Sequence, residues 1–530
     1  MNGVTTSWLP LAPILVPLGL GILMLAPMGR RARAGLALAT ALLTLLCSAL
    51  LLSAVWNGAV LVSELGAWPA PFGIVMTADR LGAFMSVLAS VSALLATWAA
   101  LVNPDPTRER HHLFTLMAVL FAGVQMSFLT GDLFNLFVAF EVMLVASYAL
   151  AVLGSTREQL REGFRYIVMN LAASALLVLA CGLTYGALGT LNFAHLAQRS
   201  AELGPNATVS AISVLLLLVF AAKGALFPLG FWLPGTYPAL PAATGTFFAA
   251  ILTKVGAYAL IRVFTTVFTQ DPALPQTLLL ILGSVTMLYG ALGMLSQREW
   301  RSVLSFAVVS SAGYIAFGLG LGTPLALRAT LSYLAVSVAV TAALFLIAAV
   351  AERAAGTRNV RARGFLDERP WLAGAFLLCA LTTAGMPPTA GFIAKFALVQ
   401  AGVQSGTPLA WVGVTCALLA SLVTLLALLN VWRGFFWGEA TGTRPAPAPR
   451  GTRLPAYAAS ALVAALALGG GSLLSFTGAA ASELRGDSYV RGVLGTGPVV
   501  IPDAPAAEQP DAEQPDAEQS DAEQPAGEQP

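Results

Sequence analysis

Long apolar stretches follow one another along almost the whole chain, separated by short polar joints. A membrane-spanning helix needs about 20 apolar residues, and the stretches leave room for about fourteen. Only 10% of the 530 residues are charged and 57% are hydrophobic, whereas soluble proteins have about 25% charged residues. The pattern excludes an ordinary soluble protein. It predicts an all-α polytopic membrane protein with helices near 8–27, 35–55, 80–102, 112–129, 132–152, 164–187, 209–240, 244–268, 274–296, 302–320, 324–351, 370–403, 407–436 and 455–476.

The arginines indicate how these helices are oriented. Cytoplasmic loops of membrane proteins collect Lys and Arg. The odd-numbered joints, which lie on one side of the membrane, together hold nineteen arginines. The opposite side, helix ends included, holds six. We therefore expect the nineteen to face the cytoplasm in a bacterial-type cytoplasmic membrane, with both termini outside. No positive cluster precedes the first apolar stretch, so this stretch is expected to be a span and not a cleaved signal peptide.

The few charges inside the predicted spans are the candidates for function. All three lysines of the chain, Lys223, Lys254 and Lys395, lie within spans, and Glu141 lies nine residues into the fifth. Each charge at the bilayer centre costs about 2.5–3.5 kcal/mol, so four of them imply a use. A desolvated lysine can release its proton, which arginine cannot. Glu141 and Lys223 are the natural pair, with a static salt bridge as the alternative. Lys254 and Lys395 have no intramembrane acid left, which favours a proton relay.

Helix breakers lie close to two of these lysines. An interrupted span leaves backbone groups that only a polar cavity or packed protein can satisfy. The sequence therefore predicts an ion or water site at each break, and a simple proline kink is the alternative. The breakers are Pro228 and Pro234 after Lys223, and Pro387, Pro388 and Gly391 before Lys395.

The two interrupted helices are the seventh and twelfth, five helices apart. An odd number of crossings reverses direction, so helices 4–8 and 9–13 are expected to form two inverted five-helix repeats. The acidic end of the chain repeats a five-residue unit with almost no apolar content, which is typical of disorder. The predicted segments are three amino-terminal helices (1–111), the first repeat (112–268), the second repeat (269–436), the last helix with its flanks (437–500) and a disordered tail (501–530).

Three motifs carry a resemblance to a known family. They are GDLFNLFVAFEVMLVASYAL (131–150), AAKGALFPLGFWLPGTYPALPAATGTFFAAILTKVGAYALIRV (221–263) and LTTAGMPPTAGFIAKF (381–396). They resemble those of the antiporter-like membrane subunits, found in Mrp-type cation/proton antiporters, respiratory complex I and membrane-bound hydrogenases. The resemblance covers about residues 80–440. It implies a lateral proton route from the glutamate and lysine of helices 5 and 7 through the relay lysine of helix 8 to the lysine of helix 12: Glu141, Lys223, Lys254 and Lys395.

Within this family the chain is most similar to D-type Mrp subunits. The complex I subunit of similar length typically has glutamate where this chain has Lys395. One departure lies in the eleventh helix, where Val336 replaces a histidine often found there. Hydroxyls of that helix, Ser332, Tyr333, Ser337 and Thr341, could hold water instead. Further candidates for a polar lining are Tyr148 and Ser310.

The resemblance implies an ion-translocating subunit of a multisubunit Mrp-type monovalent cation (Na⁺)/proton antiporter, working with other subunits in the lipid bilayer. The alternative is a proton-pumping subunit of a complex I-like NADH dehydrogenase or membrane-bound hydrogenase, and a third hypothesis is an inert scaffold. None of these is an independent enzyme. The four cysteines form no CxxC motif and the chain has three histidines, so no metal site or cofactor is expected. Nothing in the sequence indicates nucleic-acid binding.

Overall fold

The computed structural model describes residues 5–68, 73–361, 364–438 and 450–495. Within these residues, ten helices are long and apolar enough to cross a membrane, and four shorter apolar helices accompany them. Together they match the fourteen predicted spans, so the all-α polytopic fold is confirmed. The predicted acidic tail at 501–530 lies outside the described residues.

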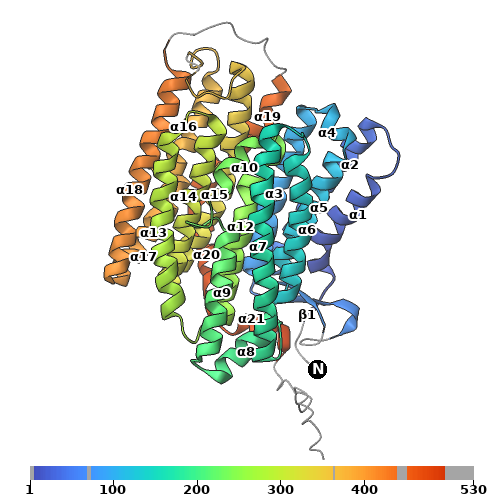
Figure 1. Cartoon of the computed structure of the whole chain (residues 1–530), viewed down its shortest axis with the longest axis vertical. Coiled ribbons are helices and arrows are strands. Elements are labelled where there is room, and N and C mark those ends of the chain that lie inside the picture. Colours follow the sequence, from blue (N-terminus) through green and yellow to red (C-terminus); the bar gives the residue numbers. More distant parts are fainter. Residues whose placement is uncertain (1–4, 69–72, 362–363, 439–449, 496–530) are drawn as a thin grey trace, which may run out of the picture. The chain divides into compact units, whose positions relative to one another are not determined.

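The helices follow the chain from blue to red in Figure 1. The spans correspond to α1 (Ala12–Leu23), α2 (Arg30–Ala54), α3 (Arg80–Val102), α5 (Leu113–Leu129), α6 (Leu133–Val152), α7 (Arg157–Leu188), α9 (Ala207–Lys223) with α10 (Leu233–Ala239), α11 (Ala242–Phe247) with α12 (Thr253–Arg262), α13 (Ala273–Ser296), α14 (Trp300–Gly320), α15 (Pro324–Ala355), α16 (Pro370–Ala384) with α17 (Ala390–Ser405), α18 (Pro408–Val431) and α19 (Leu454–Leu468). Shorter or more polar helices are α4 (Pro106–Arg110), α8 (Phe193–Leu203), α20 (Gly470–Arg485) and α21 (Ser488–Leu494).

Capping side chains set where several of these helices begin. Asp79 accepts a hydrogen bond from the backbone N–H of Gly82 at the start of α3. Asp132 does the same for Asn135 at the start of α6. Such caps satisfy N–H groups that have no partner within the helix. Both carboxylates therefore lie at helix starts.

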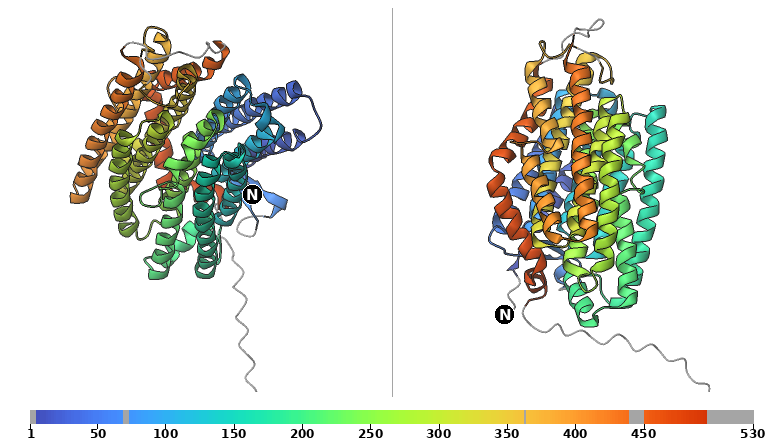
Figure 2. Two further views of the ribbon diagram at one scale, coloured as in Figure 1. Left: turned by 45° about the horizontal axis from the view of Figure 1, so that its top comes forward. Right: turned by 90° about the vertical axis from the view of Figure 1, so that its left-hand side faces the viewer.

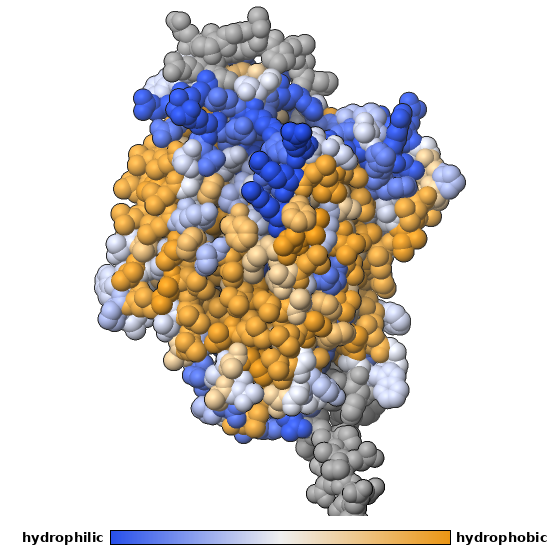
Figure 3. All heavy atoms as spheres, viewed as in Figure 1, coloured by the Kyte–Doolittle hydropathy of each residue, from blue (hydrophilic) through white to orange (hydrophobic). Residues whose placement is uncertain are grey.

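The surface of the helical bundle is divided by polarity. On the face in Figure 3, apolar residues form a broad band between two polar ends. The helices run alongside one another through this band (Figure 2). A lipid bilayer provides an apolar layer of this kind, about 30 Å thick.

Helices 7 and 12 are interrupted, as predicted. α9 ends at Lys223, and Ala225 in the break has a positive φ of 60°. α16 ends at Ala384 and is followed by Gly385, whose φ is 82°. Pro228 and Pro388 follow cis peptide bonds. A Cβ added to Gly391 would lie 1.8 Å from the carbonyl oxygen of Thr382, so only glycine lets α17 begin against the end of α16.

The two predicted five-helix groups repeat the same packing pattern. In each group the first helix packs on the second, the second on the third, the third on the fourth, and the fourth on the fifth. The observed pairs are α5 with α6, α6 with α7, α7 with α9 and α9 with α12 in the first group, and α13 with α14, α14 with α15, α15 with α17 and α17 with α18 in the second. This matched order supports the expected repeat of helices 4–8 and 9–13.

Three features differ from the expected helices. A small sheet of β1 (Thr5–Thr6), β2 (Leu61–Glu64) and β3 (Val75–Ala78) lies between helices in the order β1, β2, β3, with β1 parallel and β3 antiparallel to β2. The amphipathic α8 was not predicted, because it is too short and polar to register as a span. The last predicted helix is divided at Gly469, since α19 ends at Leu468 and α20 begins at Gly470; glycine disfavours helix continuation.

Candidate functional site

Lys223 is the last residue of α9, directly before the break. Its side chain is buried, with 5% of the residue exposed. The ammonium donates a hydrogen bond to Ser174 Oγ of α7 at 3.2 Å and lies 5.0 Å from the centre of the Phe140 ring of α6. A helix carboxyl end and an aromatic face both stabilise a cation. Lys223 therefore has a polar but uncharged set of direct contacts.

Glu141 follows Phe140 on α6 and is half-buried. No direct ion pair joins its carboxylate to Lys223, although the structure describes both residues. The Oε1 atom of Glu141 is buried without a hydrogen-bond partner among the described residues. The static salt bridge considered for this pair is thus not formed, and the carboxylate keeps an unused acceptor.

Lys254 is the second residue of α12, which directly follows a π-helical turn at Phe248–Leu252. It is 1% exposed. Its ammonium donates to Ser311 Oγ of α14 at 3.2 Å. Gly256 brings α12 against the end of α9, since a Cβ there would lie 2.5 Å from the backbone nitrogen of Gly224. The break after Lys223 and the helix that carries Lys254 are therefore in direct contact.

Lys395 lies in α17 and is 6% exposed. Its ammonium donates to the carbonyl oxygen of Thr383 at 2.9 Å and to Ser421 Oγ of α18 at 3.1 Å. The carbonyl of Thr383 is one of the last in α16, so the interrupted helix leaves it free to accept from a side chain. The ammonium of Lys395 therefore satisfies a backbone carbonyl that the interruption leaves without a helical partner.

A small cavity lies between the partners of Lys254 and Lys395. Its volume is about 20 Å³, and its lining includes Ser311, which binds Lys254, and Thr383, which binds Lys395. A space of about 10–15 Å³ is enough for one water molecule. Polar groups from α15 also line it, namely Tyr333, Ser337 and Thr341, together with Val336. The hydroxyl oxygen of Ser337 is buried without a partner among the described residues.

A second, smaller space lies beside Lys223. It has about 10 Å³ and is lined by Lys223, Asn170, Tyr166 and Trp232, among others. Trp232 belongs to the break of helix 7 and donates its indole N–H to the carbonyl oxygen of Ala222. Polar groups therefore surround the end of α9 on the side of the interruption.

The remaining predicted lining residues have different surroundings. Ser310 donates to the carbonyl oxygen of Met287 at 3.1 Å, so its hydroxyl joins two helices. Tyr148 packs edge-on against the ring of Tyr166 at 5.4 Å, and its hydroxyl is buried without a partner among the described residues. Pro234 lies in the first turn of α10, where proline needs no N–H partner.

One buried ion pair was not found from the sequence. Arg262 near the end of α12 is 1% exposed and pairs with Asp79 at 2.6 Å. Its guanidinium lies 4.6 Å from the centre of the Tyr489 ring and 5.6 Å from that of Tyr258. From the sequence, Arg262 counts only among the six arginines on the less basic side. The sequence does contain a signal, because Tyr258 precedes Arg262 by four residues and shares its helix face.

The fold and these lysines define a polytopic helical membrane protein that buries all three of its lysines, two of them at interrupted helices. The chain belongs to the family described as NADH:quinone oxidoreductase/Mrp antiporter, TM, which matches residues 130–421. It is similar to the D-type subunit of the Na(+)/H(+) antiporter of Alkalihalophilus pseudofirmus, with 43% identity over 396 residues, covering 74% of this chain and 80% of that protein.

Two solved structures are also similar. A chain in the structure of the Mrp complex from Dietzia sp. DQ12-45-1b has a TM-score of 0.86 and 30% identity, covering 92% of this chain and 99% of that chain. A chain of respiratory complex I from Thermus thermophilus with bound NADH has a TM-score of 0.77 and 23% identity, covering 90% of this chain and 100% of that chain. The second likeness concerns the fold alone.

Proposed function

We propose that this chain is a D-type, ion-translocating subunit of a multisubunit Mrp-type Na⁺/H⁺ antiporter. In this proposal it carries protons along Glu141, Lys223, Lys254 and Lys395. The observation that carries the proposal is that all three lysine ammoniums are buried and bind oxygens or aromatic rings, with no carboxylate in direct contact among the described residues. A buried charge without a counter-ion is costly, so each lysine is poised to give up its proton.

The contacts suggest how a proton passes between the second and third lysines. Lys254 binds Ser311, Lys395 binds Thr383, and both of these partners line the same water-sized cavity. A water there connects the two lysines through hydroxyls of α15. In this proposal Ser337 and Thr341 take the place of the absent histidine at Val336.

The first step involves Glu141. Its carboxylate has a buried oxygen without a partner among the described residues, and Glu141 directly follows Phe140, over whose ring Lys223 lies. A proton that arrives at Glu141 removes the nearby negative charge and weakens the hold on the Lys223 proton. Moving one charge through 100 mV is worth about 2.3 kcal/mol, which is comparable to a change of one to two pKa units at about 1.4 kcal/mol each.

The ion that follows this path is the proton and not Na⁺. Three ammonium groups line the path, and they repel a metal cation while accepting and donating protons. In the membrane, the arginine-rich end of the bundle faces the cytoplasm, and both termini lie outside. The other antiporter subunits are its partners and provide the route for the cation.

Two variants of Lys254 in the assembled complex test the proposal. Lys254→Ala removes the titrating group, and Lys254→Arg keeps the positive charge but not the ability to release a proton. Both variants should abolish Na⁺-dependent dissipation of a pH gradient in inverted vesicles, measured with a pH-sensitive dye, while the complex still purifies intact. If Lys254→Arg exchanges as well as the unmodified protein, the proton relay is wrong and a scaffold role is favoured.

The redox-driven alternative gives a different result in the same vesicles. A subunit of a complex I-like pump moves protons only while electrons flow to an acceptor. Exchange driven by an imposed Na⁺ gradient, without any electron donor, therefore supports the antiporter. Loss of all proton movement without the donor would support the pump.

A further inference from the structure

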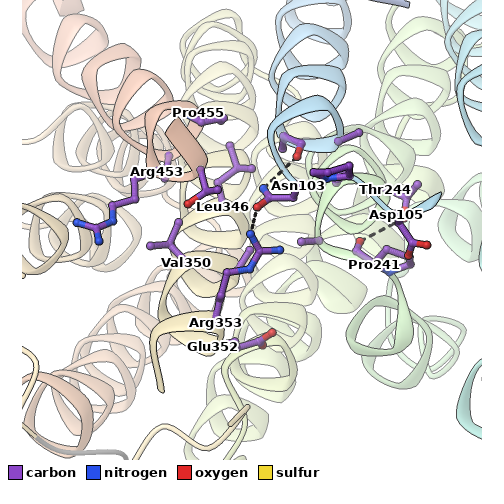
Figure 4. Close-up of a pocket in the computed structure, with 18 of the residues that line it drawn as sticks. Asn103, Asp105, Pro241, Thr244, Leu346, Val350, Glu352, Arg353, Arg453 and Pro455 are labelled. Carbon is purple, nitrogen blue, oxygen red and sulfur yellow. Dashed lines mark hydrogen bonds between the residues drawn. The ribbon is translucent and has the colours of Figure 1, made fainter. Parts of the chain in front are cut away.

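A large cavity lies at the arginine-rich end of the described helices. Its volume is about 630 Å³. Its walls come from the ends of α3 and α15 and from the starts of α11 and α19 (Figure 4). None of Lys223, Lys254 and Lys395 lines it, so it is a different space from those beside the lysines.

The charges around this cavity are strongly unequal. Two carboxylates line it, Asp105 and Glu352, against six guanidiniums: Arg108, Arg301, Arg353, Arg358, Arg369 and Arg453. Arg108 pairs with Asp105, and Arg301 pairs with Glu352 at 2.6 Å. Arg358 pairs outside the cavity with Glu158 at 3.2 Å. Three arginines are left without a carboxylate among the described residues.

These three arginines define the basic pocket: Arg353, Arg369 and Arg453. Arg353 donates to the neutral side-chain oxygen of Asn103 (Figure 4). No carboxylate of the described residues pairs with Arg369 or Arg453. Burial, and then the nearby guanidinium of Arg453, lower the pKa of Arg369. Like charges held close to each other, as those of Arg369 and Arg453 are, are stabilised by an anion between them.

A helix start adds to the positive field. α16 begins directly after Arg369, whereas α19 continues from a 3₁₀ turn at Arg450–Arg453. The first N–H groups of a helix lack internal partners, and its amino end carries a partial positive charge. An anion at such a place gains both effects. The Nε atom of Arg453 is also buried without a hydrogen-bond partner among the described residues.

The other part of the lining is apolar. Leu346 and Val350 of α15 line the cavity together with Arg353. Leu346 lies seven residues before Arg353, which is about 10 Å along a helix, toward the membrane band. The cavity is therefore basic at its outer part and apolar toward the bilayer. This gradient matches an amphipathic anion at a membrane surface.

We propose that the basic pocket binds a phosphate group. Guanidinium groups bind phosphate oxygens through paired hydrogen bonds, and the volume is sufficient for a phospholipid headgroup. The phosphate comes from an anionic membrane phospholipid or from free phosphate in the cytoplasm. The site is separate from the proton path, so it can be tested by binding alone.

The test uses the whole purified complex and a pair of matched variants. Arg369→Gln with Arg453→Gln removes two charges from the pocket. Arg31→Gln with Arg298→Gln removes two charges from arginines on the same side that do not line the cavity. Bound lipid is counted by native mass spectrometry after reconstitution in phosphatidylglycerol or phosphatidylcholine nanodiscs. Binding of radiolabelled inorganic phosphate is measured separately, in uncharged detergent.

The proposal expects about tenfold or greater loss of affinity in the pocket variant, because each charged hydrogen bond contributes appreciably. The control variant should bind like the unmodified complex. Retention of phosphatidylglycerol alone identifies the lipid, and binding of inorganic phosphate identifies the free anion. Equal binding in the pocket variant and the unmodified complex would overturn the proposal, and so would no binding of either probe. Arg369→Lys with Arg453→Lys keeps the charge and should retain part of the affinity, which separates loss of the site from misfolding.

Discussion

The ammonium of Lys395 lies 4.1 Å from the centre of the Tyr314 ring, and both side chains bind the same hydroxyl, Ser421 Oγ. Tyr314 also donates to the carbonyl oxygen of Ala417. The ring thus provides an electron-rich face for a cation that has no carboxylate partner among the described residues. Lys223 has a related contact with Phe140, although at 5.0 Å. An aromatic face stabilises a desolvated ammonium by about 2 kcal/mol.

Replacing Tyr314 by Leu should reduce Na⁺-dependent proton exchange at least severalfold, because the charged form of Lys395 loses the ring that stabilises it. Tyr314→Phe keeps the ring and loses only the hydroxyl contacts, so it should retain most of the exchange. Initial rates of pH-gradient dissipation in vesicles distinguish the two variants. Equal rates would show that the ring does not act on Lys395.

Filling the cavity between Lys254 and Lys395 should slow exchange without unfolding the protein. Thr341→Val replaces a hydroxyl of the cavity lining by a methyl group of similar size, and Ser337→Val replaces another hydroxyl and adds a methyl group. Both changes remove hydrogen-bond partners for water. Ser310→Ala is the control, since that hydroxyl binds the Met287 carbonyl. The double variant should lose about tenfold in rate and the control little. A double variant as active as the control would exclude this cavity from the path.

The buried ion pair of Asp79 and Arg262 should be important for stability. Asp79→Asn keeps a capping side chain for α3 but leaves Arg262 as a buried charge without its partner. Breaking such a pair costs about 3–5 kcal/mol. We expect a clear fall in the thermal midpoint of the purified complex. Adding Arg262→Met removes the stranded charge and should restore a large part of the loss. A midpoint unchanged by Asp79→Asn would contradict this role.

His195 should make the protein less stable in acid. It lies in α8, is 1% exposed, and neither ring nitrogen has a partner among the described residues. Burial, and then the charge of Arg199, lower the pKa of His195 below its usual value, while Glu202 acts in the opposite direction. As the pH falls to about 6.5, His195 of the unfolded chain therefore binds a proton, whereas His195 of the folded chain stays neutral. The contribution of neutral, buried His195 to the stability of the fold is complete above that pH. It is lost as the pH falls toward the lower pKa that His195 has in the folded chain.

The thermal midpoint measured between about pH 7.5 and about pH 5.5, on either side of the ordinary histidine pKa, tests the role of His195. His195→Leu should remove part of the decrease seen at the lower pH. His111→Gln, at an exposed position, should leave the decrease unchanged. If the two variants follow the same pH curve, protonation of His195 does not govern the loss.

Much of the architecture could be predicted from the sequence because membrane insertion depends on local properties. Hydropathy over about 20 residues located the fourteen spans, and prolines next to lysines located both interruptions. The four candidates stood out because ionisable residues are rare and costly in apolar segments. Errors arose where the local pattern was weak, as in α8 and in the small sheet. The division of the last helix was missed because its glycines lie in an otherwise continuous apolar pattern.

The partners of each charge were decided only by the tertiary structure. Lys254 and Ser311 are 57 residues apart, and Asp79 and Arg262 are 183 residues apart. The helix faces that meet depend on how all the helices pack together, so neither pair follows from the chain order. The sequence determined that lysines are buried beside interrupted helices. The packing determined that their ammoniums bind hydroxyls, carbonyls and rings, and that Arg262 pairs with the carboxylate of Asp79. Contacts between helices depend on the packing of the whole bundle, so the sequence alone does not give them.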